Sequence, residues 1–437
     1  MSTRVVLDPR NRWLRDGRLL TPTGRLLRLS GAGRRALGDL ASQPSLAARL
    51  VEAGAAHPAP DPRPAGDVAV VVPVKDRAAA LDRCLAALGP ADVLVVDDGS
   101  VDAAAVESVC ARHGARLVRR PNGGPAAARN TALPLLDKDF VLFLDSDCVP
   151  PADLLARLRG HLDDPAVVAV APRVVGGARS PLDLGPHPAP VRPGTAVAYV
   201  PTAALLVRRS ALTPFDESLR YGEDVDLVWR LADGGWVVRY DPSVVVAHEE
   251  PARLLDRLVR RYHYGTSAAP LSRRHPGHLT HLVLPPWPTA VVGLLLQRRP
   301  VLAAATAALA TARLDEQVHD RTTSARLVAT STAATALGVG RALQLAGPLA
   351  WWAARRRPVV AGLLVAPLLA EWRQRRPAED PLSYTARGLL DQAAYGAGVV
   401  VGCLRARTAR PLLPRRRALR FPDHRGRTPD KDGETDT

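Results

Sequence analysis

At 437 residues and 47% hydrophobic composition, the chain is long enough to bury the cores of two or three domains. Its formal net charge of +16 is unevenly spread, with arginine clusters between Arg298 and Arg427 that predict an anionic partner, either lipid headgroups or nucleic acid. No zinc-ligand spacing, basic zipper or aromatic RNA-binding motif accompanies these arginines, so we expect no nucleic acid partner. The four cysteines form no C-x-x-C pair, which favours buried thiols over disulfides or a zinc site.

Residues 1–57 are predicted to form a small N-terminal module. Two apolar stretches at 18–20 and 25–29 flank a turn, and Ser30 can cap a following helix, so we expect a hairpin followed by helices. This order resembles a winged-helix or peptide-clasping module, and a packing extension of the main domain is an equal alternative. Residues 58–66 form a proline-rich linker that marks the next boundary.

From residue 67 to residue 278 the pattern becomes strand–helix–strand. The expected elements lie at 68–72, 78–88, 92–96, 106–113, 116–118, 125–136 and 140–144. Alternation of this kind predicts an α/β Rossmann-like domain whose sheet is covered on both faces. Ligands then bind at the carboxyl ends of the strands, which places two acidic pairs on one rim, Asp97-Asp98 and Asp145-Asp147.

Residues 279–410 are rich in apolar helical segments, but each is short or interrupted by arginine or proline. Trp351 and Trp352 lie beside Arg355–Arg357, a pairing that a bilayer interface selects, so we expect a helical region attached to a membrane surface. A water-soluble helical bundle is the alternative. The first ten residues have no signal-peptide pattern, which predicts the cytoplasmic face of the membrane, and residues 411–437 are expected to be a disordered tail.

Asp145 and Asp147, with Ser146 between them, follow the apolar strand at 140–144. Residues i and i+2 of an extended segment point to the same side, so both carboxylates can face one cation. Oxygen ligands suit Mg²⁺ or Mn²⁺, which neutralise a bound diphosphate, and His248 at the end of another apolar run can complete the metal shell. Helix capping for the acidic pair and simple exposure for the histidine remain alternatives.

Asp97 and Asp98 end the strand at 92–96, where one of them can accept a hydrogen bond from a nucleobase N–H group. The alternative is an Asx turn leading into a helix. The glycines at 123–124 then predict a helix N-terminus, which favours an anion. Arg129 lies one turn into that helix and can orient Asp97 or a phosphate; a surface arginine is the competing interpretation.

Glu223 and Asp224 begin an amphipathic helix near the same rim, where a carboxylate suits a general base for an incoming hydroxyl group. Acidic residues in a first helical turn are also ordinary helix chemistry. The first strand of the domain is followed by Pro73, Val74 and Lys75 instead of G-x-G-x-x-G, which argues against a dinucleotide-binding dehydrogenase.

Taken in order over about residues 67–264, these motifs resemble family 2 inverting glycosyltransferases. The resemblance implies a GT-A fold with a Rossmann-like mixed sheet, a nucleotide-sugar donor and a divalent metal. It implies that Asp97 or Asp98 binds the nucleoside and that Asp145 and Asp147 bind nucleotide and metal. The remaining donor-binding positions are Pro73, Val74, Lys75, Arg129 and Ser146.

In the same resemblance Asp224, beside Glu223, matches the catalytic base of a single displacement with inversion. Two departures are visible. Lys75-Asp76 replaces the usual aromatic-Asn pair, and residues 257–262 (RLVRRY) replace the Q-x-x-R-W motif of processive members. The second departure puts synthesis of a long polymer in doubt.

More narrowly, the whole chain resembles the mycofactocin-system glycosyltransferases of actinobacteria, through residues 25–30 (RLLRLS), 51–58 (VEAGAAHP), 73–77 (PVKDR) and the Arg-rich C-terminal region. This resemblance implies transfer of glucose, with UDP-glucose as the first donor to test, to a peptide-derived redox cofactor. Two rival hypotheses remain: a membrane glycosyltransferase of cell-wall or lipid-linked polysaccharide synthesis, and a non-enzymatic membrane protein that binds sugar nucleotides or peptides.

Overall fold

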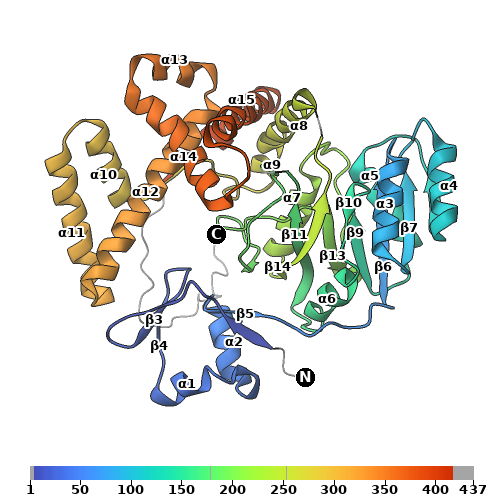
Figure 1. The fold of residues 1–437 in the computed structure, drawn as a ribbon, viewed down its shortest axis with the longest axis horizontal. Helices are drawn as coiled ribbons and strands as arrows, with labels where there is room; N and C mark the ends of the chain where they lie inside the picture. The colour runs from blue at the N-terminus through green and yellow to red at the C-terminus, as the bar shows by residue number, and fades with distance from the viewer. Residues whose placement is uncertain (1–3, 178, 252, 417–437) are drawn as a thin grey trace, which may run out of the picture.

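The computed structural model describes residues 4–177, 179–251 and 253–416. Three parts are visible in Figure 1: an N-terminal module below, an α/β domain to the right, and C-terminal helices above and to the left. The described cysteines are all free and buried, as their scattered positions predict.

The N-terminal module contains two small antiparallel sheets and two helices. Strands β1 and β5 pair with each other, and β2, β3 and β4 form the second sheet. The elements are β1 (Val5–Leu7), β2 (Arg12–Trp13), β3 (Arg18–Leu20), β4 (Leu26–Arg28), α1 (Gly31–Ala36), α2 (Pro44–Glu52) and β5 (Ala56–Pro58). The expected hairpin is β3–β4, and the Ser30 hydroxyl caps α1 by accepting from the Gly33 N–H at 3.0 Å. The pairing of β1 with β5 and the strand β2 are additions to the predicted pattern.

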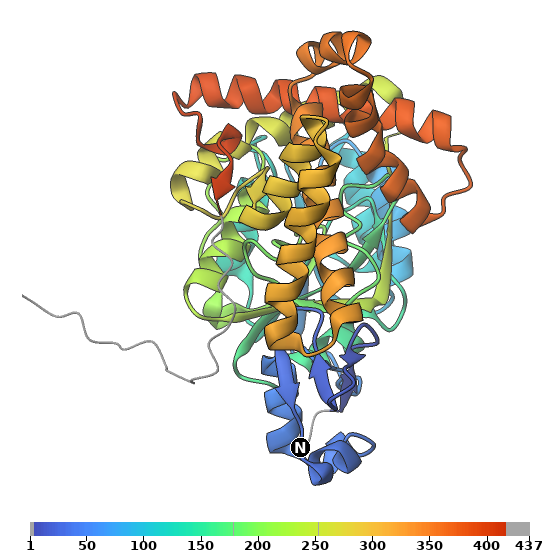
Figure 2. The same ribbon diagram turned by 90° about the vertical axis from the view of Figure 1, so that its left-hand side faces the viewer.

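The module packs against the C-terminal helices. Leu14 and Leu20 share a small core with Val318. The Arg18 guanidinium donates to the backbone carbonyls of Gln317 at 2.9 Å and Val318 at 2.6 Å. The module therefore contacts the end of α11, which is far away in the sequence. Figure 2 shows the module beneath these helices from the side.

The α/β domain is built on one mixed sheet, in the order β10-β14-β11-β13-β9-β6-β7-β8, with β12 paired to β14. Strands β6 to β9 run parallel, while β13 and β10 are antiparallel to their neighbours. The strands are β6 (Val68–Val74), β7 (Asp92–Asp97), β8 (Arg116–Arg119), β9 (Phe140–Leu144), β10 (Cys148–Val149), β11 (Val167–Val175), β12 (Ala189–Pro190), β13 (Ala204–Arg208) and β14 (Val237–His248). This is the GT-A arrangement that the sequence predicts.

Helices cover both faces of this sheet, because alternate residues of its buried strands point to opposite sides. Val70 and Val72 of β6 pack with α3, α4 and α6, whereas Ala69 and Val71 pack with α5 and α7. The helices are α3 (Ala78–Leu88), α4 (Ala103–His113), α5 (Pro125–Ala132), α6 (Leu154–His161) and α7 (Glu223–Asp233). The helix predicted at 125–136 ends at Ala132 and continues as a 3₁₀ turn, Leu133–Leu135.

The C-terminal part contains eight helices among the described residues. They are α8 (Leu254–Thr266), α9 (Ala268–Arg274), α10 (Pro286–Leu296), α11 (Pro300–Val318), α12 (Arg321–Leu345), α13 (Pro348–Arg356), α14 (Pro358–Arg375) and α15 (Pro381–Arg405). Within the described ranges, none of these helices combines the length and the apolarity needed to cross a bilayer.

Helix α15 packs closely against α8, and glycines make this contact possible. At Gly265 and Gly398, an added Cβ atom would collide with the backbone of the opposite helix, at the Tyr395 and Tyr262 carbonyls respectively. Helix α15 is therefore docked directly on α8, the helix that follows the last strand of the α/β domain, and Figure 1 shows the two helices next to each other.

The predicted tail boundary at residue 411 is wrong for its first residues. Strand β16 (Arg415–Arg416) pairs in parallel with β15 (Val283–Leu284), and the Arg415 guanidinium donates to the Gly277 carbonyl at 2.7 Å. Backbone pairing and this hydrogen bond keep residues 415–416 in a defined position, whereas their polar sequence by itself predicts disorder. Residues 417–437 lie outside the described residues.

Candidate active site

The carboxyl ends of β6, β7 and β9 form one rim of the sheet. The parallel register pairs Val74 with Asp97, and Asp145 follows the last residue of β9. On the far side of the sheet, β14 ends at His248, which pairs with Cys148 directly after Asp147. Strand register thus brings acidic residues and a histidine from distant segments to one edge.

A cavity of about 480 Å³ lies at this rim. The predicted site residues that line it are Arg129, Asp145, Asp147, Glu223, Asp224 and His248. The remaining predicted donor-binding residues are not among those that line it; these are Pro73, Val74, Lys75, Asp97, Asp98 and Ser146. The structure therefore gathers the predicted metal and base residues in one cavity, with the nucleoside residues farther along the rim.

Arg129 joins two parts of the cavity wall. Its side chain is 3% exposed and donates to Glu223 Oε1 at 2.9 Å and to Asp145 Oδ1 at 2.8 Å. Burial alone would lower the pKa of Arg129, but the charges of Asp145 and Glu223 outweigh it and raise the pKa. A permanently charged guanidinium therefore links the end of β9 to the first turn of α7, and the surface-arginine alternative is wrong.

Glu223 and Asp224 open α7 at a constrained turn. Gly222 adopts a positive φ of 83°, and an added Cβ atom there would lie 3.0 Å from Leu271, so the turn favours glycine. Burial, followed by the neighbouring Asp224 charge, raises the pKa of Glu223 to about 7. Burial also raises the pKa of Asp224, although the charge of Arg129 opposes this.

The two carboxylates differ in their partners. Glu223 accepts from Arg129, whereas the Asp224 Oδ1 atom accepts from the Val225 N–H at 2.8 Å. Among the described residues, no other side chain is seen to hydrogen-bond or pair with Asp224. Asp224 is thus the carboxylate free to face a ligand in the cavity, and Glu223 serves to hold Arg129.

Asp145, Asp147 and His248 all line the cavity and offer ligand types that a divalent cation accepts, although among the described residues they do not form a group with all ligand atoms within 4.8 Å. The Nε2 atom of His248 lies 3.6 Å from Asp147 Oδ1, and its Nδ1 atom lies 3.6 Å from Glu250 Oε1. Burial raises the pKa of Asp145, and the adjacent Asp147 charge adds to this. A cation placed among these carboxylates would relieve the repulsion between them.

The Asp147 carboxylate is already paired with a cation. The Arg77 guanidinium contacts Asp147 Oδ2 and keeps 47% of its side chain exposed. Sequence analysis singled out Lys75 in the same loop, which is exposed here, and overlooked Arg77. Spacing alone does not decide which basic residue of this loop turns toward the acidic rim.

Asp97 and Asp98 make the backbone contacts of the Asx-turn alternative. Asp97 Oδ1 accepts from the Ser100 N–H at 2.8 Å. Asp98 accepts from the N–H groups of Gly123 at 2.9 Å and Gly124 at 2.7 Å, so it caps the entry to α5. These bonds shape the loops of the rim, and nucleoside binding by either aspartate stays a prediction.

Val74 and Ser146, which are predicted to bind the sugar donor, do not line the cavity. The Val74 side chain points into the core, and its carbonyl accepts from the Asp98 N–H at 2.9 Å. Ser146 is buried in the turn between Asp145 and Asp147. Any contact that these two residues make with a sugar donor would therefore come from their backbone atoms, which the side-chain pattern does not predict.

The cavity also contains a basic and aromatic wall that sequence analysis missed. Arg260, Arg261 and Tyr264 of α8 line it together with Tyr199 and Tyr395, and Arg261 stacks over the Tyr395 ring with its guanidinium carbon 5.1 Å from the ring centre. The first three follow helical spacing within the RRYHY run, which was a usable signal. Tyr395 comes from α15 and has no local signal.

The sequence profile described as Glycosyl transferase family 2 matches residues 69–196. This stretch runs from β6 to just beyond β12 and contains Asp145 and Asp147, and together with the GT-A sheet it identifies the protein as a glycosyltransferase. Among solved structures, glucosyl-3-phosphoglycerate synthase from Mycobacterium tuberculosis is 22% identical, with a TM-score of 0.38, covering 47% of this chain and 79% of that one. The S. aureus TarS 1-349 complex with UDP is 17% identical, with a TM-score of 0.36, covering 46% and 65%.

A similarity over nearly the whole chain identifies the family more narrowly. The pre-mycofactocin glycosyltransferase of Mycobacterium tuberculosis (strain ATCC 25618 / H37Rv) is 39% identical over 462 aligned positions, which cover 94% of this chain and 97% of the relative. The chain belongs to the pre-mycofactocin glycosyltransferase family. The alignment extends far beyond the family 2 region, so it includes most of the N-terminal module and the C-terminal helices.

Proposed function

We propose that the protein transfers a hexose, with glucose as the first candidate, from a nucleotide-sugar donor to the peptide-derived redox cofactor pre-mycofactocin. The full-length similarity to a relative named for that acceptor supports the proposal. The observation that carries the chemistry is the cavity in which Asp224 is left free while Arg129 engages Glu223 and Asp145.

On the donor side, Asp145, Asp147 and His248 would hold Mn²⁺ or Mg²⁺. When bound, the cation neutralises charge on the leaving diphosphate. Arg260 and Arg261 add positive charge to the wall of the cavity, and guanidinium groups can bind phosphate oxygens. Arg129 keeps Asp145 in place from the protein side, so the carboxylate is oriented before a donor arrives.

On the acceptor side, Asp224 is the proposed general base. The acceptor hydroxyl oxygen attacks the anomeric carbon as its proton passes to Asp224, and the bond from that carbon to the diphosphate oxygen breaks. One displacement of this kind inverts the anomeric configuration. Burial raises the pKa of Asp224, which makes its carboxylate a stronger proton acceptor than an exposed aspartate.

The test is mass spectrometry of products from purified protein with a panel of nucleotide sugars, including UDP-glucose. Each donor is combined with either a pre-mycofactocin acceptor or a polyprenyl phosphate, with and without Mn²⁺. We expect one or a few hexoses on the peptide-derived acceptor. Transfer to the lipid alone would favour the rival function in cell-wall or lipid-linked polysaccharide synthesis and overturn the proposed acceptor.

Variants then test the assigned base. We expect Asp224→Asn to lose at least about 100-fold in turnover, the typical contribution of a positioned general base. Asp92→Asn is the matched control, because Asp92 begins β7 at the opposite edge of the sheet and pairs with Arg116 there. Wild-type turnover in Asp224→Asn would contradict the assignment.

We further propose that the enzyme works at the cytoplasmic face of the cell membrane, attached through α13. Leu349, Trp351 and Trp352 are exposed on that helix by 75%, 36% and 55%, and its last turn contains Arg355 and Arg356. Exposed tryptophans beside arginines suit the boundary between acyl chains and anionic headgroups. Co-sedimentation with anionic vesicles should fall in Trp351→Ser/Trp352→Ser; unchanged binding would exclude α13 as the attachment.

A further inference from the structure

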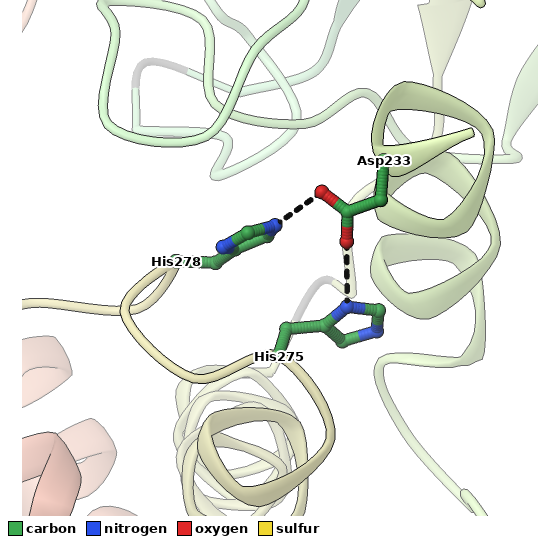
Figure 3. A group of neighbouring side chains, drawn as sticks. All are labelled: Asp233, His275 and His278. Carbon is green, nitrogen blue, oxygen red and sulfur yellow. Dashed lines mark hydrogen bonds and ion pairs between the residues drawn. The ribbon is translucent and has the colours of Figure 1, made fainter. Parts of the chain in front are cut away.

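A second cluster of metal-binding side chains lies at the opposite end of α7 from the proposed base. Asp233 ends this helix, and His275 and His278 follow α9 (Figure 3). Asp233 lies ten positions after Glu223 along the helix, which corresponds to a rise of about 15 Å. The cluster is thus distinct from the acidic rim, although His278 also lines the cavity.

His275 has a partner on each side of its ring. Its Nε2 atom lies 2.9 Å from Asp226 Oδ1, and its Nδ1 atom lies 3.4 Å from Asp233 Oδ2. Asp226 also accepts from Arg230 at 2.8 Å and from Arg274 at 3.0 Å.

Asp226 accepts from two arginines, so its carboxylate acts as an acceptor and the Nε2 atom of His275 is placed to donate to it. In the neutral ring, Nδ1 then presents a lone pair toward the Asp233 carboxylate. Two electron-rich atoms at this distance repel each other unless a proton or a cation lies between them. A carboxylate behind a histidine is also the usual support of a metal-binding imidazole, because it orients the ring and fixes the tautomer.

His278 completes the cluster from the other side of the same carboxylate. Its Nε2 atom lies 2.7 Å from Asp233 Oδ1, and its ring stacks on His275 at 5.5 Å with an interplanar angle of 26°. The Trp229 ring contacts both imidazoles edge-on, which limits their movement. The ligand atoms of the three residues lie within 4.8 Å of one another.

The donor set decides which class of metal fits. Zinc binds imidazole nitrogen and carboxylate oxygen at about 2.0–2.2 Å, so tetrahedral ligands lie about 3.3–3.6 Å apart, and small side-chain rotations reach this from the observed positions. Two imidazoles favour zinc, cobalt or nickel over magnesium, which prefers oxygen ligands. The oxygen-rich rim at Asp145 and Asp147 has the opposite preference.

We propose that Asp233, His275 and His278 bind a transition-metal ion, with zinc as the first candidate. Bound there, the ion links the end of α7 to residues 275–278. The segment that follows, 279–281, lines the cavity. The metal thereby stabilises the part of the cavity wall that residues 279–281 form.

The test uses untagged full-length protein, stripped with a chelator, in an Asp147→Ala background that disables the acidic rim as a competing metal site. Zinc and magnesium are titrated separately by calorimetry, and thermal unfolding is measured with and without zinc. We expect one equivalent of zinc to bind and to raise the melting temperature, and magnesium not to bind at this site.

Adding His278→Gln or Asp233→Asn should lower zinc affinity by about tenfold or more and remove the thermal shift. Both side chains are partly exposed, so the variants should fold, which circular dichroism checks. His113→Gln is the matched control, because His113 pairs with Asp82 at the same 2.7 Å distance elsewhere in the domain. No zinc binding, or equal loss in His113→Gln, would overturn the proposal and leave an ordinary hydrogen-bond network.

Discussion

Replacing Arg129 with methionine tests whether one buried cation holds the acidic site together. The Arg129–Glu223 pair is shielded on both sides, with side chains 3% and 9% exposed. Removing one partner of such a pair leaves an uncompensated buried charge, which costs about 3–5 kcal/mol. The Asp145 carboxylate is 31% exposed, so losing that pair adds only about 0–1 kcal/mol.

At pH 8 Glu223 can instead take up a proton for about 1.4 kcal/mol, because its pKa is about 7, so we expect Arg129→Met to lower the free energy of unfolding by about 1–2 kcal/mol at this pH. For a domain of about 200 residues this lowers the melting temperature by about 2–8 °C. The assay is thermal unfolding followed by circular dichroism at pH 8 and pH 5. Because the pKa of Glu223 is about 7, its carboxyl group is neutral at pH 5 in both proteins, and the difference between them should shrink.

A double variant separates the ion pair from simple loss of packing. Arg129→Met combined with Glu223→Gln removes both charges, so it should melt above Arg129→Met alone at pH 8. The reasoning is refuted if Arg129→Met melts within about 2 °C of wild type at pH 8. It is equally refuted if the loss is the same at pH 5.

Three further outcomes are expected. Folding raises the pKa of Glu223 to about 7, so the contribution of Glu223 to the free energy of unfolding is full below about pH 4.5 and is lost as the pH rises through 7. This loss amounts to about 3 kcal/mol, and Glu223→Gln should remove it, which denaturant titration at several pH values measures. Gly398→Val should separate α15 from α8 and cut transfer activity, whereas Gly362→Ala, whose added Cβ meets nothing within 4 Å, should not. Chelation should abolish transfer, with activity restored by Mn²⁺; full activity in the chelator would contradict a metal at Asp145 and Asp147.

The acidic rim could be predicted because local patterns and one general rule suffice. Apolar strands at 68–74, 92–97 and 140–144 are buried on both faces, and parallel strands end at the same edge. The carboxylates after the last two strands must therefore lie on one rim. The order of motifs along the chain then indicates the family, which the full-length similarity confirms.

Partner choice within the rim could not be predicted. Asp98 has the sequence context of a ligand-binding residue, yet its carboxylate accepts from the backbone of Gly123 and Gly124. Arg129 could have been a surface residue, and it is instead among the most buried charges. The partners of Asp98 and Arg129 depend on the conformation of the loops at the rim. Several carboxylates lie close to each N–H group there, and the sequence does not show which of them accepts the hydrogen bond.

The sequence by itself determined the α/β class, the rim that bears Asp145 and Asp147, and the position of Asp224 at a helix start. Local periodicity and strand direction are enough for these. Only the tertiary structure decided that Tyr395 of α15 reaches the cavity and that His275 and His278 meet Asp233. These contacts join segments far apart in the chain. These residues reach their partners because whole helices pack against each other, and no short-range sequence pattern predicts that packing.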